Sequence, residues 1–328
     1  MRWEWKSISN IIHDLEERLK KVAPTDRDKL ISPIGKEEVE KGIDTLKHGK
    51  AVATDLISND ILKATKEIVS PFLVALFNKI IINEVFPEEW SLGIIQPIFK
   101  SGDLMDTNCY RGISIISCLS KLFMVILNNR LQTFCDDHNI IHFNQIGFRM
   151  SFRPADHVFT MKTLIDQAYR DKEGLYVCFV DFRKAYDTVW RDGLYHKLLS
   201  YNVNPVFVRL LRNIYKHSSL AVKTQSGRSS IFASNMGLKQ GCNLSPLLFN
   251  LCINDFLTEV SMSFTHSPHL EDTLVNALMY ADDLVLISKS ENGLQNSLSL
   301  SLSLSLSLPL SSLSPSFFSL FFSFSLPF

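Results

Sequence analysis

The first ninety residues carry the spacing of hydrophobic positions that is typical of helices. Segments 7–22 and 36–48 place apolar residues three and four positions apart among mixed charges. Segment 61–83 continues as a largely apolar helix, which we expect to break near Pro71. The pattern changes after Trp90, so the N-terminal part is predicted to be helical up to that point.

Short apolar runs rich in β-branched residues follow. "GIIQPIFK" and "NCYRGISIIS" predict two extended segments around a turn at Gly102. Helices are expected over 119–136 and 155–169. The run "LYVCFVDF" at 175–182 has the continuous apolar character of a buried strand and ends in an aspartate, and a helix is predicted over 184–201. Helices therefore alternate with short strands in this part of the chain.

The stretch "LMYADDLVLIS" sets Asp282 and Asp283 between two apolar runs that predict a buried hairpin. A buried carboxylate without a partner costs several kcal/mol, so the pair indicates a cation, a shared proton or exposure at a cleft. A solvated hairpin turn is the alternative. Asp181 ends the other buried strand, and two strand ends side by side would bring three carboxylates together. Such oxygen ligands suit Mg²⁺, and a site of this kind can hold two metals for phosphoryl transfer.

Three motifs occur in a fixed order: "FVDFRKAYDTVWRDGL", "MGLKQGCNLSPLLFNLCINDF" and "YADDLVLIS". Together with "EEVEKGIDTLKHGKA", "IIQPIFKSGDLMDTNCYRGISIISCLSKLF" and "NQIGFR" upstream, they resemble the reverse transcriptases of LINE-type (non-LTR) retrotransposons. The resemblance covers roughly residues 33–296. A lone YxDD is a weak signal, whereas three motifs and the upstream segments in order are a specific one.

The resemblance implies an α+β fold with the fingers and palm of a right-hand polymerase, in which helices back an antiparallel palm sheet. The expected domains are a helical lead-in at 1–32, fingers at 33–170, a palm at 171–296, and a disordered low-complexity tail at 297–328. The implied activity is RNA-directed DNA polymerisation, a nucleotidyl transfer from a dNTP to a primer 3′-hydroxyl on an RNA template.

The resemblance also assigns the carboxylates. Asp181 and Asp282 would be the principal ligands of two Mg²⁺ ions, with Mn²⁺ as a possible substitute, and Asp283 a less direct contributor. The metals would lower the cost of the charges that develop as the primer attacks the α-phosphate. The implied partners are an RNA template, a DNA primer and a dNTP, with no membrane.

Three further residues are expected near the incoming nucleotide. Tyr186 matches the aromatic that would collide with a ribose 2′-hydroxyl and so select deoxynucleotides; packing on the following helix is the alternative. Lys100 and Arg111 flank the Gly102 turn and could donate charge-assisted hydrogen bonds to the triphosphate. The alternative for both is a surface ion pair with the acids of the turn.

The segment "GLKQGCNLSP" carries glycines that permit close backbone approach, followed by Ser245, an N-cap residue that opens a helix. By resemblance, Gln240 and Gly241 contact the nascent base pair and the template strand. Arg149 would contact the template backbone, although "MSFRP" replaces the basic, small-residue segment usual in the family. Ala53 stands where the family usually has glycine, which puts a turn in doubt.

Charge and cysteine content narrow the alternatives. The formal net charge is zero, which argues against a wholly basic nucleic-acid coat. Residues 188–240, however, hold eight basic residues and one acidic residue, a net charge of +7 that predicts phosphate contacts or a solvated helical face. Six cysteines without a CxxC pair or a secretory signal predict reduced thiols in an intracellular protein, nuclear or cytoplasmic.

From Ser297 to Phe328 every residue is Ser, Leu, Pro or Phe, the amino acids whose codons can be built wholly of pyrimidines. This tail looks like translated simple-repeat DNA, and its serines and prolines argue against a membrane span. We expect it to replace the family's lysine-bearing segment and helical thumb, and the chain as given to be inactive. The alternatives are a non-catalytic nucleic-acid-binding remnant and a reverse transcriptase like that of group II intron maturases.

Overall fold

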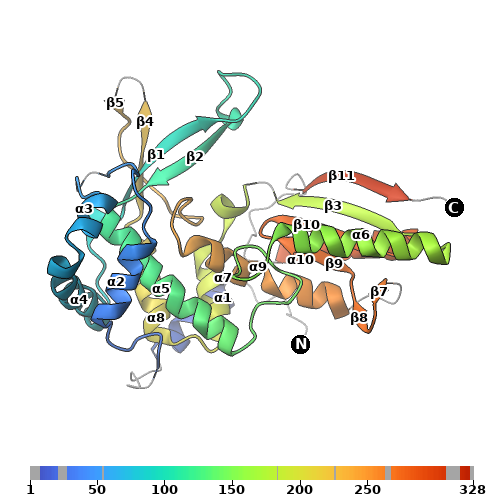
Figure 1. Cartoon of the computed structure of the whole chain (residues 1–328), viewed down its shortest axis with the longest axis horizontal. Helices are drawn as coiled ribbons and strands as arrows, with labels where there is room; N and C mark the ends of the chain where they lie inside the picture. The colour runs from blue at the N-terminus through green and yellow to red at the C-terminus, as the bar shows by residue number, and fades with distance from the viewer. Residues whose placement is uncertain are drawn as a thin grey trace. The chain divides into compact units, whose positions relative to one another are not determined.

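The chain forms a mixed α and β structure divided into two compact units (Figure 1). The computed structural model describes residues 8–20, 28–53, 55–182, 184–224, 227–262, 267–307 and 318–325. The aspartate unit consists of Met1–Trp5, which lies outside the described residues, Asn139–Leu194 and Pro246–Phe328; the hairpin unit consists of Lys6–His138 and Tyr195–Ser245. Each unit is thus assembled from segments that are distant in sequence.

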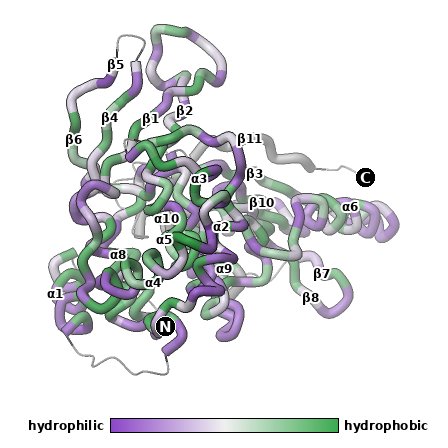
Figure 2. The backbone as a smooth tube through the Cα atoms, turned by 60° about the vertical axis from the view of Figure 1, so that its left-hand side comes forward, coloured by the Kyte–Doolittle hydropathy of each residue, from purple (hydrophilic) through white to green (hydrophobic). Residues whose placement is uncertain are grey.

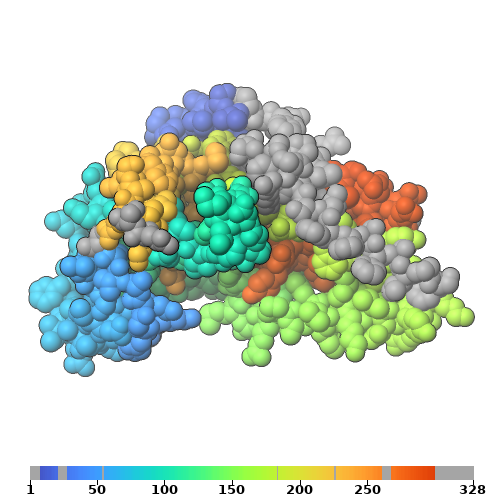
Figure 3. Space-filling view, turned by 90° about the horizontal axis from the view of Figure 1, so that it is seen from above, coloured from blue at the N-terminus to red at the C-terminus, as the bar shows by residue number. Residues whose placement is uncertain are grey.

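The hairpin unit packs helices beside a mixed sheet. Its helices are α1 (Ile8–Leu19), α2 (Lys36–Thr45), α3 (Asn59–Ala64), α4 (Lys66–Asn83), η1 (Glu88–Trp90), η2 (Thr107–Cys109), α5 (Cys118–Asp137) and α8 (Pro205–Lys216). Its strands are β1 (Leu92–Phe99), β2 (Tyr110–Ile115), β4 (Ser219–Thr224), β5 (Gly227–Arg228) and β6 (Phe232–Ala233). The strand order is β2-β1-β4-β5, with β6 also paired to β4. Strand β1 pairs antiparallel with β2 and parallel with β4, which makes the sheet mixed. Figure 3 looks down on the exposed tip of the β1–β2 hairpin.

The aspartate unit is built around an antiparallel sheet in the order β11-β3-β10-β9. Its elements are α6 (Pro154–Asp171), β3 (Tyr176–Phe182), η3 (Ala185–Thr188), α9 (Ser245–Met262), β7 (His269–Leu270), β8 (Thr273–Leu274), β9 (Ala277–Tyr280), β10 (Asp283–Ser288), α10 (Glu291–Ser307) and β11 (Phe318–Ser325). Helix α7 (Arg191–Ser200) continues from this unit into the other. The predicted antiparallel sheet with helices against it is therefore present.

Two helices cover opposite faces of this sheet. Leu164 and Ala168 of α6 join Val177 of β3 and Ile287 of β10 in one buried cluster. In Figure 2, α6 alternates hydrophobic and hydrophilic positions along its length, as expected for a helix with one face against a sheet. On the other face, the ring of Phe256 of α9 contacts the ring of Phe182 of β3, with centroids 6.1 Å apart. Because helices cover one face and the far half of the other, the strands contain the continuous apolar runs seen in the sequence.

Two helix predictions are wrong in detail. Helix α4 runs through Pro71, and the interruption lies at Thr65, between α3 and α4. Pro71 is exposed, so the carbonyl group that loses its intrahelical partner can be hydrated. The single helix predicted over 184–201 is instead the short η3 followed by α7.

The tail, for which the sequence analysis expects disorder, contributes two described elements: the end of α10 and the strand β11, which pairs with β3. None of the described helices is both long and apolar enough to cross a membrane. No disulfide joins the six cysteines, all of which are described, and five of them are buried.

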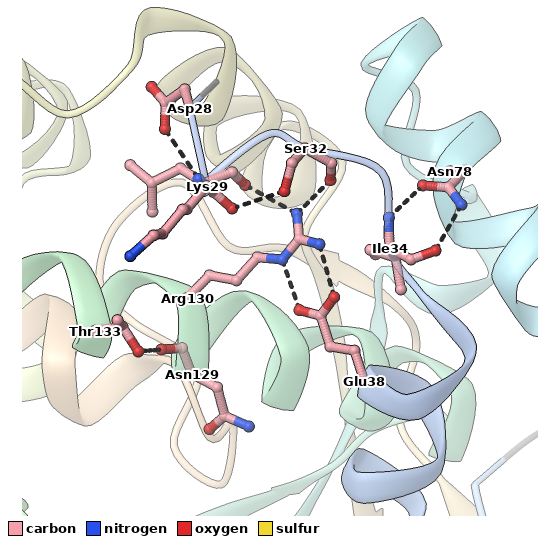
Figure 4. A network of polar contacts seen from close by, with 10 residues as sticks. Asp28, Lys29, Ser32, Ile34, Glu38, Asn78, Asn129, Arg130 and Thr133 are labelled. Atoms are coloured by element: carbon pink, nitrogen blue, oxygen red, sulfur yellow. Dashed lines mark hydrogen bonds and ion pairs between the residues drawn. The ribbon is translucent and has the colours of Figure 1, made fainter. Parts of the chain in front are cut away.

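One buried arginine ties three segments of the hairpin unit together (Figure 4). Arg130 of α5 has a side chain only 8% exposed and donates to both carboxylate oxygens of Glu38, at 2.6 and 2.7 Å. Its remaining nitrogen donates to the carbonyl oxygens of Leu30 and Ser32, at 3.3 and 2.6 Å. The loop before α2 is thereby fixed to α5, and Asn78 of α4 bonds both backbone groups of Ile34 in the same loop.

We expect Arg130→Ala to lower the free energy of unfolding by about 3 kcal/mol, because it leaves a partly buried carboxylate and two carbonyl groups without their donor. Chemical denaturation measures the change. Lys36→Ala, which removes an exposed ion pair to Glu40, is the control and should change stability by less than about 1 kcal/mol. Equal losses in the two variants would contradict this account of Arg130.

Candidate active site

The three predicted carboxylates lie at one end of the antiparallel sheet. Asp283, the first residue of β10, pairs in register with Asp181 of β3 and with Tyr280 of β9. Ala281 and Asp282 form the two-residue loop of the β9–β10 hairpin. Residues directly opposite in an antiparallel pair have side chains on the same face, so Asp181 and Asp283 are neighbours. The adjacent strand ends expected from the sequence are therefore present.

This end of the sheet face is open. Helix α6 covers the far half of the face, where Val177 and Ile287 are buried. Near the carboxylates Phe179 is 45% exposed, and Asp181 and Asp283 are both exposed. Asp181 and Asp283 are therefore accessible to solvent on the part of the face that α6 leaves uncovered.

The three carboxylates concentrate negative charge at this end of the sheet. Burial raises the pKa of Asp283, and the negative charges of Asp282 and Asp181 raise it further. Among the described residues, no three His, Cys, Asp or Glu side chains are grouped closely enough to hold a metal ion. Asp181 and Asp282 are thus near enough to Asp283 to raise its pKa, and carboxylate oxygens are the donors that a hard cation such as Mg²⁺ prefers.

Tyr186 lies five residues after Asp181, in η3, with its side chain half-buried. Its ring stacks on Phe249 of α9, with centroids 5.0 Å apart and an angle of 17° between the planes. The ring therefore packs on α9 and not on α7, the helix that directly follows Tyr186 in the chain. This contact fixes the orientation of the ring and leaves part of it accessible.

The hairpin unit carries the other predicted nucleotide contacts. Lys100 and Arg111 are exposed on the β1–β2 hairpin, and neither forms an ion pair with a described residue. The acids of the turn are used locally: Asp103 accepts from the Met105 backbone N–H, and Asp106 from that of Asn108. Both basic side chains thus remain available for an anion.

The loop that carries Gln240 and Gly241 packs against β2. The backbone N–H of Ser114 donates to the carbonyl oxygen of Gln240 at 3.0 Å. Gly241 has φ +100°, and a Cβ there would lie 2.9 Å from the carbonyl oxygen of Ser114. Only glycine fits this close approach, which holds the loop on the strand that carries Arg111.

Arg149 is engaged within its own loop. Its Nη1 donates to the carbonyl oxygens of His142 and Gln145, at 3.5 and 3.3 Å. Its guanidinium also lies 4.8 Å from the centroid of the Phe152 ring. A template contact by Arg149 would therefore use a side chain that the loop has already oriented.

The basic window at 188–240 is not a free phosphate-binding surface. Arg191, Lys197 and Lys239 are buried. Arg209 forms a two-pronged ion pair with Glu84, and Arg212 pairs with Glu16. Only Lys216, Lys223 and Arg228 of the eight basic residues are exposed. Most of these cations therefore support the fold, and phosphate contact by this window stays a prediction.

The sequence did not point to the residues that hold the loop between β9 and β10. Gln145 and Gly147 contact Ala281, and Asn250 donates to the carbonyl oxygen of Gly147 at 2.7 Å. His157, whose pKa is lowered by burial, lies within hydrogen-bond distance of the carbonyl oxygens of Asn144 and Met279. The signal was present in "NQIGFR", where only the arginine was assigned a role.

Comparison with known proteins agrees with the motifs. The family described as "Reverse transcriptase (RNA-dependent DNA polymerase)" matches residues 98–306, which is more than half of the chain. A probable RNA-directed DNA polymerase from transposon BS of Drosophila melanogaster is 30% identical over 262 residues, 79% of this chain and 28% of the relative. The RNA-directed DNA polymerase from mobile element jockey of Drosophila funebris is 27% identical over 259 residues, 79% of this chain and 28% of the relative.

A third relative, the Pol polyprotein from type-1 retrotransposable element R2 of Nasonia vitripennis, is 27% identical over 223 residues, 68% of this chain and 21% of the relative. The chain thus spans about a quarter of the length of these curated relatives. The match includes all three motifs and the strands β3, β9 and β10 of the sheet that carries the carboxylates. The chain therefore belongs to the reverse transcriptase (RNA-dependent DNA polymerase) family.

Proposed function

We propose that this chain is an RNA-directed DNA polymerase domain, with the aspartate unit as palm and the β1–β2 hairpin as part of the fingers. The observation that carries the proposal is the register of β3 and β10, which sets Asp181 opposite Asp283 with Asp282 in the adjoining loop, at an open sheet end. The substrates would be an RNA template, a DNA primer and a dNTP.

Asp181 and Asp282 would hold two Mg²⁺ ions, with Asp283 assisting. When bound, the ions would lower the pKa of the primer 3′-hydroxyl and neutralise charge on the transferred phosphate. The chain's own residues would orient the reactants: Lys100 and Arg111 by donating to phosphate oxygens, and Gln240 and Gly241 by contacting the nascent base pair and the template. Arg149 would contact the template backbone, and Tyr186 would exclude a ribose 2′-hydroxyl.

The test is Mg²⁺-dependent dNTP incorporation on poly-rA/oligo-dT. Because the uncharged tail is expected to limit activity, a chimera with a family thumb in place of 297–328 is assayed beside the chain as given. We expect Asp181→Asn and Asp282→Asn to lower incorporation on the order of 10² to 10³, because each removes charge stabilisation of the transition state. Asp171→Asn, an exposed acid at the end of α6, is the control. Unchanged incorporation in both site variants would refute the proposal.

Tyr186→Val should relax discrimination against ribonucleotides in any active form of the domain, since valine removes the ring that would meet the 2′-hydroxyl. The comparison is the ratio of kcat/KM for a dNTP and the matching rNTP. Tyr186→Phe keeps the ring stacked on Phe249 and should keep the discrimination. If the valine variant still excludes rNTPs as well as the wild type, Tyr186 only packs against α9.

Asp283→Asn should raise the melting temperature at neutral pH in EDTA. Because the folded-state pKa of Asp283 is raised, ionising this carboxyl destabilises the fold as pH rises from the ordinary aspartate value through the raised one. The difference in melting temperature between variant and wild type should vanish at pH values below both the ordinary and the raised pKa of this carboxyl. Added Mg²⁺ should stabilise the wild type more than the variant. Thermal melts across pH check this, and a constant difference at all pH values would contradict it.

A further inference from the structure

Ala281 has a backbone conformation that is uncommon for its residue type. Its φ is +56°, in the left-handed region that glycine adopts readily and alanine does not. It is 2% exposed and immediately precedes Asp282. The direction in which the loop presents Asp282 therefore depends on whatever holds Ala281 in this conformation.

One side chain bonds both peptide groups of Ala281. The Ala281 N–H donates to Gln145 Oε1 at 3.0 Å, and Gln145 Nε2 donates to the Ala281 carbonyl oxygen at 3.1 Å. Gln145 is 0% exposed, and its Oε1 also accepts from the Gly147 N–H at 3.0 Å. A single amide thus takes the place of the main-chain partners that the tight loop lacks.

The segment around Gln145 lies beside β9 like an additional strand. Met279 N–H donates to the Asn144 carbonyl oxygen at 2.9 Å, and Ile146 N–H donates to the Met279 carbonyl oxygen at 3.0 Å. A Cβ on residue 147 would overlap the backbone nitrogen of Ala281, so only glycine allows the approach. The position of the Gln145 amide relative to the loop is thereby set by the main chain.

Helix α9 fixes this segment in turn. Asn250 Nδ2 donates to the Gly147 carbonyl oxygen at 2.7 Å. Asn254 Nδ2 donates to the Ile140 carbonyl oxygen, and its Oδ1 accepts from the His142 N–H, both at 2.8 Å. Side chains on consecutive turns of one buried helix therefore anchor both ends of the segment.

We propose that Gln145 is a positioning residue: its amide holds Ala281 in the left-handed conformation and so sets where Asp282 and Asp283 present their carboxylates to a divalent cation. The proposal rests on the proposed function, in which these carboxylates bind the metal. It adds a residue, Gln145, that touches neither metal nor substrate. Variants of the aspartates test the proposed function, and variants of Gln145 test its positioning role, so either proposal can be refuted without the other.

The direct test is residue-resolved hydrogen exchange of the chain as given, without metal. In Gln145→Ala we expect the protection factor of the Ala281 amide to fall roughly tenfold, because that amide loses its acceptor. The amide of Leu284, within the β3–β10 ladder, should keep its protection. Gln295→Ala, an exposed glutamine on α10, is the matched control and should change neither amide. Unchanged protection at Ala281, or an equal loss throughout the sheet, would overturn the proposal.

The double variant Gln145→Ala/Ala281→Gly separates positioning from packing. Glycine adopts a positive φ without strain, so adding Ala281→Gly should restore part of the Mn²⁺ affinity that Gln145→Ala loses, measured by electron paramagnetic resonance. Absence of rescue by the glycine variant would overturn the positioning role.

Mn²⁺ binding by Asp181→Asn distinguishes the two proposals. Loss of Mn²⁺ affinity in Asp181→Asn together with a roughly tenfold loss in Gln145→Ala supports both. Loss in Asp181→Asn with wild-type affinity in Gln145→Ala overturns the positioning role and leaves the proposed function standing. Wild-type affinity in Asp181→Asn overturns the proposed metal site itself, whatever the exchange data show.

Discussion

The antiparallel pairing of β3 with β10 is the constraint on which the aspartate unit depends, because it places Asp181 directly opposite Asp283. Like charges in opposed positions destabilise a sheet. Burial raises the pKa of Asp283, and the charges of Asp282 and Asp181 raise it further. The register is nevertheless fixed by the apolar residues farther along, where Val177 and Ile287 are buried against α6. A shift by one residue would turn those side chains to the wrong face, so burial at one end of the strands holds the charges together at the other.

The loop between β9 and β10 is likewise held in its conformation by residues buried elsewhere in the unit. Ala281 has φ +56°, and its backbone groups are bonded by Gln145, which lies 136 residues earlier in the chain. Gln145 is in turn held by a segment that Asn250 and Asn254 attach to α9. A buried amide whose oxygen and nitrogen both form hydrogen bonds is stiffer than a solvated one, so the geometry of the carboxylates is set by the core of the unit.

The hairpin unit uses its charges in two ways. Arg130 and Arg209 form two-pronged pairs with Glu38 and Glu84 and also donate to backbone carbonyls, so they join helices and loops. Lys100 and Arg111, by contrast, are exposed on the β1–β2 hairpin. Charge counted along the sequence does not separate these two roles, because a cation that is paired inside the fold contributes little to attracting phosphate.

The sequence by itself determined the strand that carries Asp181, the apolar hairpin around Asp282 and Asp283, and the family, because apolar periodicity and motif order are local properties of the chain. It did not determine that α4 continues through Pro71, since that depends on whether the freed carbonyl group is solvated. Tertiary structure alone decided that Gln145 contacts Ala281 and that most cations of the 188–240 window are buried or paired. Those contacts join residues far apart in sequence, and which pairs meet is fixed by how the sheet and its helices pack, which no local pattern of residues records.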